Sequence, residues 1–182
     1  MRLKISLDID GTICDWWNPY LNKFGRPKTS LEITKNVSNK LRKDKAFWLA
    51  LPVIEYPNFI PRQYTTARLI NKDWIKEYLR TNHFPDAPVY QVLGYSLSKV
   101  PKLKMGGCDV HIDDSIDTFI RTNLEGIPTL LLDRPNNSEW GPIGRIFSLD
   151  KEEIEDSYFL FKDTVFNYFK DFVDDYKQRV FR

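Results

Sequence analysis

The feature that most constrains the fold of this chain is the alternation of short strand patterns with helical patterns. Most of the strand patterns are separated by segments whose apolar residues recur at three- and four-residue spacing, which is typical of helices. Strands that alternate with helices of about 10–15 residues form βαβ units and a parallel sheet. The sequence therefore predicts an α/β fold with a mostly parallel five-stranded sheet flanked by helices. The predicted strands are residues 3–9, 61–66, 88–93, 109–113 and 128–133.

The segment between the first two predicted strands is too long for a simple connection in a compact domain. Helical patterns occupy residues 15–24 and 36–50, with the turn-rich stretch "RPKTSLEI" between them. We therefore expect a small helical cap at residues 15–60, inserted into a core formed by residues 1–14 and 61–182. Residues 151–182 form a helical C-terminal extension of this core, with a stripe of aromatic residues that is able to pack on the domain or in a homodimer.

Composition excludes several classes of protein. The chain has 182 residues, of which 42% are hydrophobic and 29% charged, as in an ordinary globular protein with one main core. No apolar run is long enough to span a membrane, and no export signal is evident, so we expect a cytoplasmic protein. The two cysteines and two histidines lack the spacing of a zinc site, and we interpret His111, in the middle of a strand, as a packed residue.

Pairs of aspartates stand where two predicted strands end. Asp8 and Asp10 are two residues apart, so both can face the same side, and Gly11 then lets the backbone turn. Asp113 and Asp114 end the fourth strand, and ligands of open α/β sheets bind beyond these carboxyl ends. Carboxylates so close repel one another unless a cation lies between them or one holds a proton. Oxygen ligands of this kind predict a Mg²⁺ site.

Hydroxyl and ammonium groups accompany these carboxylates. Thr65 and Thr66 end the second strand in "YTTAR", and Lys99, Lys102 and Lys104 precede the fourth strand. A hydroxyl, an ammonium group and Mg²⁺ together suit the spreading negative charge of a phosphoryl group. These residues therefore predict phosphoryl chemistry at this edge of the sheet.

Taken in order, these elements resemble the haloacid dehalogenase (HAD) superfamily of phosphotransferases over roughly residues 1–150. "DIDGT" is similar to its first motif, "YTTAR" to the second, Lys99 to the third and "HIDDS" to the fourth. The resemblance implies a Rossmann-like core and a hydrolase that works through an aspartyl phosphate. Asp8 would be the nucleophile, and Asp10 would protonate the leaving oxygen and then activate water.

The same resemblance implies the roles of the other residues. Mg²⁺ would be held by Asp8, the main-chain carbonyl of Asp10, and Asp114, with Asp113 in support. Two further residues would contact the phosphoryl group, Thr66 by hydrogen bonds and Lys99 by its charge; Lys102 remains the alternative to Lys99. The substrate site would also include Gly11 and Thr12 of the first motif.

Two segments are similar to the 5'(3')-deoxyribonucleotidase family of cytosolic type C, namely "DKAFWLALPVIEY" and "LLDRPNN". Trp16 aligns with an aromatic residue that stacks on the base in those enzymes, and stacking suits any nucleobase. Phe47 and Trp48 are further candidates, although packing inside the cap explains them equally well. The second motif departs from the family because Ala67 replaces a frequent serine. Arg68 would then either contact the phosphate or lie on the surface.

The resulting hypothesis is a Mg²⁺-dependent 5'-nucleotidase that hydrolyses (deoxy)ribonucleoside monophosphates. One alternative is a polynucleotide 3'-phosphatase, because the basic run at residues 34–45 can contact a nucleic-acid backbone as well as form a solvated helix face. The near-balanced net charge of +2 argues against a dedicated nucleic-acid surface. A further alternative is a HAD-like binding module without activity.

Overall fold

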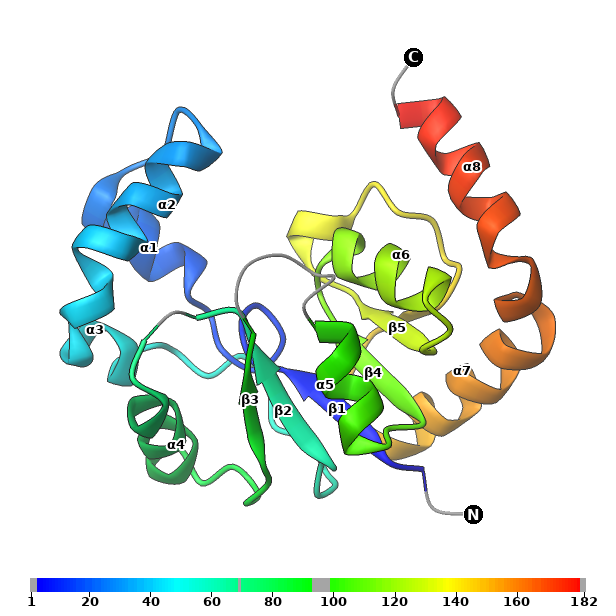
Figure 1. Ribbon diagram of the computed structural model, residues 1–182, viewed down its shortest axis with the longest axis horizontal. Helices are drawn as coiled ribbons and strands as arrows, with labels where there is room; N and C mark the ends of the chain where they lie inside the picture. The colour runs from blue at the N-terminus through cyan, green and yellow to red at the C-terminus, as the bar shows by residue number, and fades with distance from the viewer. Residues whose placement is uncertain (1–2, 69, 93–98, 181–182) are drawn as a thin grey trace.

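The computed structural model describes residues 3–68, 70–92 and 99–180. Within these residues the chain forms one sheet in which every neighbouring pair of strands is parallel, in the order β3-β2-β1-β4-β5-β6 (Figure 1). The strands are β1 (Ile5–Asp8), β2 (Gln63–Thr66), β3 (Val89–Gln91), β4 (Val110–Asp113), β5 (Thr129–Leu132) and β6 (Arg145–Ile146).

The predicted α/β class and parallel sheet are confirmed, but the predicted number of five strands is wrong. The sixth strand, β6, has two residues and pairs with β5 at the edge of the sheet. A strand this short shows no alternation that a sequence pattern can reveal. Of the predicted strand at 88–93, residues 89–91 form β3, and residue 93 lies outside the described residues.

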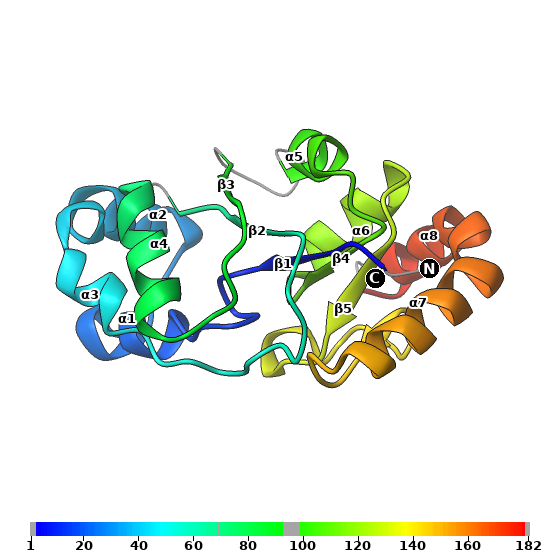
Figure 2. The same cartoon turned by 90° about the horizontal axis from the view of Figure 1, so that it is seen from below.

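Helices cover both sides of the sheet. Figure 2 shows α5 and α6 together on one side and α7 on the other. The helices are α1 (Trp17–Phe24), α2 (Ser30–Asn39), α3 (Lys45–Leu49), α4 (Lys72–Thr81), α5 (Lys99–Gly106), α6 (Ile116–Leu124), α7 (Lys151–Thr164) and α8 (Phe169–Val180), and the 3-10 turns are η1 (Leu41–Lys43), η3 (Pro135–Asn137) and η4 (Phe166–Tyr168).

Strand β1 lies in the middle of the sheet, between β2 and β4. Its four residues are all buried, and Leu7 has no exposed surface. Asp8, its last residue, pairs in register with Thr65 of β2. Because the strands are parallel, the ends of β1, β2 and β4 meet at one edge of the sheet. This arrangement brings the acidic motifs together.

The insertion, residues 15–60 between β1 and β2, contains α1, α2, η1 and α3. The segment predicted to be helical at 36–50 is helical in separate pieces, namely the end of α2, then η1 and α3. The side chain of Thr29 accepts a hydrogen bond from the N–H of Glu32 at 3.3 Å and starts α2 early, within the stretch expected to be turns. The side chain of Asp44 accepts one from the N–H of Phe47 at 3.0 Å and starts a separate helix, α3. Two capping residues thus divide the segment.

The chain leaves and re-enters the core at one place. The N–H of Asp15 donates to the carbonyl of Pro52 at 2.9 Å, and the N–H of Ile54 donates to the carbonyl of Ile13 at 3.0 Å. These bonds flank the bridge between Cys14 and Val53, where the two connections run antiparallel. The insertion is therefore attached through two paired segments.

The C-terminal extension packs on the core through aromatic side chains. Phe169 of α8 lies 5.2 Å from Phe119 of α6 between ring centroids, and Phe161 of α7 contacts both rings. Trp140 packs against Phe119 at 5.1 Å. Part of the stripe thus completes the core of this domain; residues 181–182 lie outside the described residues. In the described part of the chain, no helix is both long and apolar enough to cross a membrane.

Phe119→Ala is expected to destabilise the fold by about 3–5 kcal/mol, because it removes a fully buried ring that joins α6 to α7 and α8. Phe147, whose side chain is 68% exposed, provides the matched control, and Phe147→Ala should change stability by less than about 0.5 kcal/mol. Denaturant unfolding of the two variants measures both values. Equal losses of stability in the two variants would show that the aromatic cluster does not hold the extension on the core.

Candidate active site

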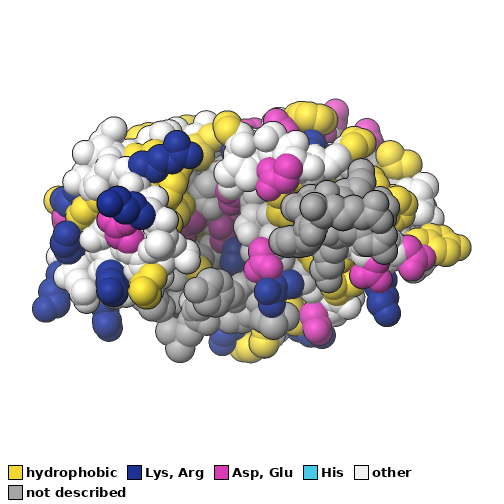
Figure 3. Space-filling view, turned by 90° about the horizontal axis from the view of Figure 1, so that it is seen from above, with side chains coloured by type: hydrophobic (Ala, Val, Ile, Leu, Met, Phe, Trp, Pro, Cys, Tyr) yellow, Lys and Arg dark blue, Asp and Glu magenta, His cyan; other side chains and the backbone are white. Residues whose placement is uncertain are grey.

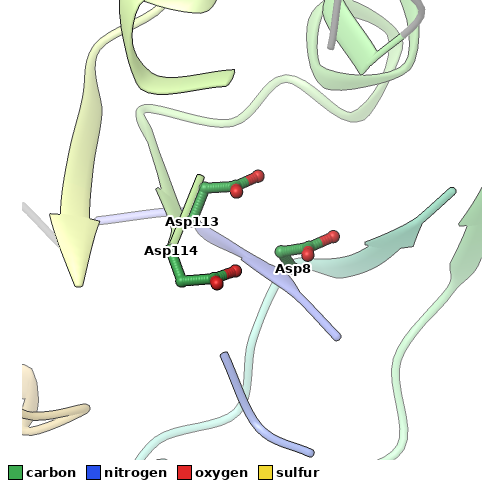
Figure 4. A group of neighbouring side chains, drawn as sticks. All are labelled: Asp8, Asp113 and Asp114. Atoms are coloured by element: carbon green, nitrogen blue, oxygen red, sulfur yellow. The ribbon is translucent and has the colours of Figure 1, made fainter. Parts of the chain in front are cut away.

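Three buried aspartates form an acidic cluster at the carboxyl edge of the sheet. Asp8 ends β1, Asp113 ends the neighbouring β4, and Asp114 follows directly after it. One carboxylate oxygen from each lies within 4.8 Å of the others. Figure 4 shows the three carboxylates pointing the same way from the two strand ends. The structure therefore brings together the carboxylates of the first and fourth motifs.

Lys99, the first residue of α5, reaches into this cluster. Its Nζ lies 2.6 Å from a carboxylate oxygen of Asp8 and 2.6 Å from one of Asp113, and its side chain is 6% exposed. Lys102, three residues further along α5, is partly exposed and makes neither contact. The structure thus places Lys99, and not the alternative Lys102, between the two strand ends.

Burial and the neighbouring charges shift the pKa values of all three carboxylates in the cluster. Burial raises the pKa of Asp8 well above its usual value, although Lys99 opposes this shift. Burial and the charge of Asp113 raise the pKa of Asp114 to about 7. Burial also disfavours the charged form of Asp113, but Lys99 and His111 outweigh it and lower the pKa to about 2. Two of the three carboxylates therefore lack sufficient positive charge nearby.

A divalent cation fits this donor set. When ionised, the four aspartates of the region carry four negative charges, and the two cations paired with them carry two positive charges. Two negative charges therefore remain in excess. Oxygen-only ligands at this spacing suit Mg²⁺, which would also counter the burial that raises the pKa of Asp8 and Asp114. The residues counted are Asp8, Asp10, Asp113, Asp114, Lys99 and Arg68.

Gly11 lets the backbone pass close to Asp114. Its φ is +81°, and a Cβ added here would lie 2.2 Å from the Oδ2 atom of Asp114. The N–H of Gly11 donates to the carbonyl of Cys14 at 2.9 Å, which closes the turn after β1. Thr12 follows in this turn, fully buried, and its hydroxyl has no hydrogen-bond partner among the described residues. The first motif thus requires glycine for conformation and for space.

Asp10 lies beside the cluster but is held by other residues. Its Oδ2 accepts a hydrogen bond from the hydroxyl of Thr66 at 2.7 Å, and its Oδ1 accepts one from Nε of Arg68. The alternative in which Arg68 lies on the surface is therefore wrong, because its side chain is buried against Asp10. Ala67, between the two, is exposed.

A cavity of about 470 Å³ lies between the acidic cluster, of which Asp114 alone lines it, and the insertion. In Figure 3 the surface is hollowed between these two parts, with acidic side chains in its depth. Trp16 lines the cavity, whereas Phe47 and Trp48 do not; the buried indole of Trp48 donates to the carbonyl of Leu41 at 2.7 Å, as expected for packing inside the insertion. The other lining residues are Gly11, Asp15, Trp17, Asn18, Ile54, Asp114, Arg134, Pro135 and Asn136.

A larger hollow of about 1010 Å³ lies elsewhere, along α4 and β3. None of the acidic cluster lines it. The cavity beside Asp114 is therefore the one relevant to the carboxylates.

Three residues that were not predicted as site residues hold the cluster in place. The side chain of Asn136 donates to Oδ2 of Asp114 at 2.9 Å, and that of Asn137 donates to the carbonyl of Asp114 at 2.8 Å. His111 is buried, as expected, but its Nε2 lies 3.1 Å from Oδ2 of Asp113. The available signals were the "LLDRPNN" loop and the two-residue spacing between His111 and Asp113, which places both on one face of β4.

Comparison with known proteins adds little to this geometry. No family model matches the sequence, and no curated protein matches it. A solved structure of a haloacid dehalogenase-like family hydrolase from Streptococcus pneumoniae is similar to this chain, with 12% sequence identity and a TM-score of 0.41. The match covers 85% of this chain and 90% of that one.

Gly11→Ala is expected to displace Asp114 and to weaken Mg²⁺ binding by about tenfold or more, because groups that orient metal ligands have effects of this size. Gly107→Ala is the matched control: Gly107 also has a positive φ, +60°, but a Cβ there meets nothing within 4 Å. Titration calorimetry with Mg²⁺ measures the affinity of both variants. If the two variants bound Mg²⁺ with similar affinity, Asp114 would not be a ligand of the metal.

Proposed function

We propose that this protein is a Mg²⁺-dependent phosphomonoesterase of the HAD type. The observation that carries the proposal is Lys99 in contact with both Asp8 and Asp113 at the ends of adjacent strands, with Asp114 beside them. A buried carboxylate next to an ammonium group and a set of metal-ligand oxygens suits attack on a phosphoryl group. The order of the four motifs in the sequence supports the same assignment.

Asp8 would be the nucleophile. One of its carboxylate oxygens attacks the phosphorus, the bond from phosphorus to the ester oxygen breaks, and an aspartyl phosphate forms on Asp8. Lys99 contacts Asp8 at 2.6 Å and would stabilise the charge shared by the carboxylate and the phosphoryl oxygens. Water then attacks the phosphorus of this intermediate, which releases phosphate and restores Asp8.

Asp10 would move the protons in both steps. Its carboxyl group, once protonated in the substrate complex, would give that proton to the leaving oxygen in the first step, and the resulting carboxylate would take a proton from the attacking water in the second. Asp10 is near enough to Asp8 for its charge to contribute to the raised pKa of that group. Thr66, expected from the sequence to contact phosphate, donates its hydroxyl to Asp10 in this structure, which orients the acid.

Asp8 and Asp114 would hold Mg²⁺ together with the main-chain carbonyl of Asp10, and Asp113 would support them from beside the metal. When bound, the ion offsets the negative charge of the carboxylates and the phosphoryl oxygens. Asn136 fixes the orientation of Asp114 by its hydrogen bond at 2.9 Å. The buried Asp113 receives hydrogen bonds from Lys99 and from the N–H of Ser115, so it would support the ligands beside it.

The substrate that the cavity suits best is a nucleoside monophosphate. Its volume of about 470 Å³ is in the range of small-molecule sites, and the indoles of Trp16 and Trp17 lie on its wall. An indole ring offers a face on which a base can stack. The insertion would then serve as a cap that limits access to the carboxylates, as expected for a nucleotidase similar to the 5'(3')-deoxyribonucleotidases.

One observation favours a second candidate, a phosphatase that acts on polynucleotide ends. The insertion carries eight Lys and Arg residues and four Asp and Glu residues. All eight basic side chains are exposed, and Figure 3 shows basic side chains gathered on this part of the surface. A basic face next to the cavity suits the phosphate backbone of a nucleic acid.

The experiment that tests the proposal measures phosphate release in the presence of Mg²⁺ from nucleoside monophosphates, sugar phosphates and 3'-phosphorylated oligonucleotides. We expect the highest kcat/KM for nucleoside monophosphates, because their bases can use the indole wall of the cavity. Faster turnover of oligonucleotides would favour the second candidate. If the folded protein released phosphate from none of these esters, the alternative of a HAD-like binding module without activity would be favoured.

Asp8→Asn should lower kcat by at least about 10³-fold, because an amide cannot form the covalent intermediate. Nucleotide binding in the presence of Mg²⁺ should remain measurable by calorimetry, since the cavity is unchanged. Asp171→Asn, at an exposed site on α8, is the matched control and should retain full activity. Unchanged phosphate release by the Asp8 variant would remove Asp8 from the mechanism.

A further inference from the structure

Arg68 occupies an unusual position for a cation. It follows the end of β2 by two residues, and its side chain is 3% exposed. Nε donates to Oδ1 of Asp10, and Nη2 lies 2.6 Å from Sγ of Cys14. Burying a guanidinium group is costly unless it is paired, and here the pair is the carboxylate of Asp10. Two of the three guanidinium nitrogens thus bond to protein groups, Nη1 is buried without a partner among the described residues, and Arg68 does not line the cavity beside Asp114.

The main chain at Arg68 also supports the other contact of Asp10. The main-chain N–H of Arg68 donates to Oγ1 of Thr66 at 3.1 Å, and that hydroxyl donates to Oδ2 of Asp10 at 2.7 Å. Arg68 therefore acts on both carboxylate oxygens, on one directly and on the other through Thr66. Together these bonds restrict the rotation of the Asp10 carboxyl group.

The faces of the guanidinium contact rings from two different parts of the molecule. Its central carbon lies 4.8 Å from the ring centroid of Trp48, on α3 of the insertion, and 5.9 Å from that of Tyr78, on α4 of the core. The helices α3 and α4 pack against each other, and Figures 1 and 2 show them side by side. A cation over an aromatic face is attracted to it, more strongly when buried. Arg68 therefore contacts α3 of the insertion, α4 of the core and the carboxylate of Asp10.

The ring of Trp48 is itself fixed. Its indole N–H donates to the carbonyl of Leu41 within the insertion at 2.7 Å, and the residue is 2% exposed. A displacement of α3 relative to the core would therefore move the ring that covers Arg68. Through the contact of Trp48 with Arg68, the packing of the insertion can affect the orientation of the Asp10 carboxyl group.

We propose that Arg68 is a positioning residue that orients Asp10 for proton transfer and makes this orientation depend on the docking of α3 through Trp48. The inference rests on the proposed function, in which Asp10 protonates the leaving oxygen. It replaces the two roles suggested by the sequence, a phosphate ligand or a surface residue.

Substrates with different leaving groups can isolate this role. A nucleoside leaves through an alkoxide oxygen that needs a proton from Asp10, whereas p-nitrophenol leaves readily as an anion. Loss of Asp10 orientation should therefore slow the nucleotide more than p-nitrophenyl phosphate. A lost phosphate contact would instead raise KM for both substrates, and general damage to the fold would lower kcat for both by the same factor.

The test measures kcat and KM of wild type and Arg68→Gln with a nucleoside monophosphate and with p-nitrophenyl phosphate. We expect kcat for the nucleotide to fall about 10- to 100-fold, a partial loss of the roughly 10²- to 10⁴-fold that general acid catalysis contributes, and KM to stay within about twofold. The loss for p-nitrophenyl phosphate should be several times smaller. Arg121→Gln, at a partly exposed arginine paired with Asp117 on α6, is the matched control and should behave as wild type.

Two further variants complete the test. Arg68→Lys keeps the buried charge but has a single nitrogen, so its loss of kcat with the nucleotide should be intermediate. If Arg68→Gln does not fold, the Arg68→Lys variant provides the same comparison of the two substrates. Trp48→Leu does not touch Asp10, yet it should reproduce the selective loss with the nucleotide. Thermal unfolding of each variant separates loss of fold from loss of orientation.

The outcomes distinguish this proposal from the one on which it rests. If wild type releases no phosphate from any ester, both are overturned. If wild type is active and the folded Arg68 variants lose activity equally with both substrates, or show raised KM, the positioning role is overturned while the proposed function stands. If the Arg68 variants show the selective loss and folded Trp48→Leu does not, the dependence on α3 is overturned.

Discussion

The contact of Lys99 with Asp8 and Asp113 is the interaction on which the rest of the site depends. It joins the ends of β1 and β4 to the start of α5 and brings a positive charge to a place where three carboxylates are buried together. Without that charge, burial would favour protonation of these groups and their mutual repulsion would separate the strand ends. Lys99 and His111 together lower the pKa of Asp113, whereas burial raises the pKa values of Asp8 and Asp114.

Much of this arrangement can be predicted from the sequence, because its causes are local. Apolar runs that end in aspartates locate the ends of β1 and β4, and the capping residues Asn71 and Ser115 locate the starts of α4 and α6. The rule that parallel strands end at the same edge then converts separate motifs into a single site. Gly11 was also recognisable, since a turn directly after a strand favours a residue that tolerates positive φ.

Other features depend on contacts between distant segments and leave no local signal. Lys99 and Lys102 stand on the same short helix, and only the position of α5 relative to the sheet decides which one reaches the carboxylates. The burial of Arg68 requires the insertion to place Trp48 over it. The division of the insertion into short helices depends on which of several capping residues are used, and β6 is defined by its pairing with β5 alone.

The paired attachment of the insertion has a consequence for how such a protein can evolve. Because residues 13–15 and 52–54 leave and enter the core side by side, the distance that the inserted chain must bridge is short and does not depend on its length. Lengthening a connection between neighbouring ends costs little chain entropy. The inserted segment can therefore be enlarged, shortened or exchanged at little entropic cost, while the strand register below it is inherited unchanged.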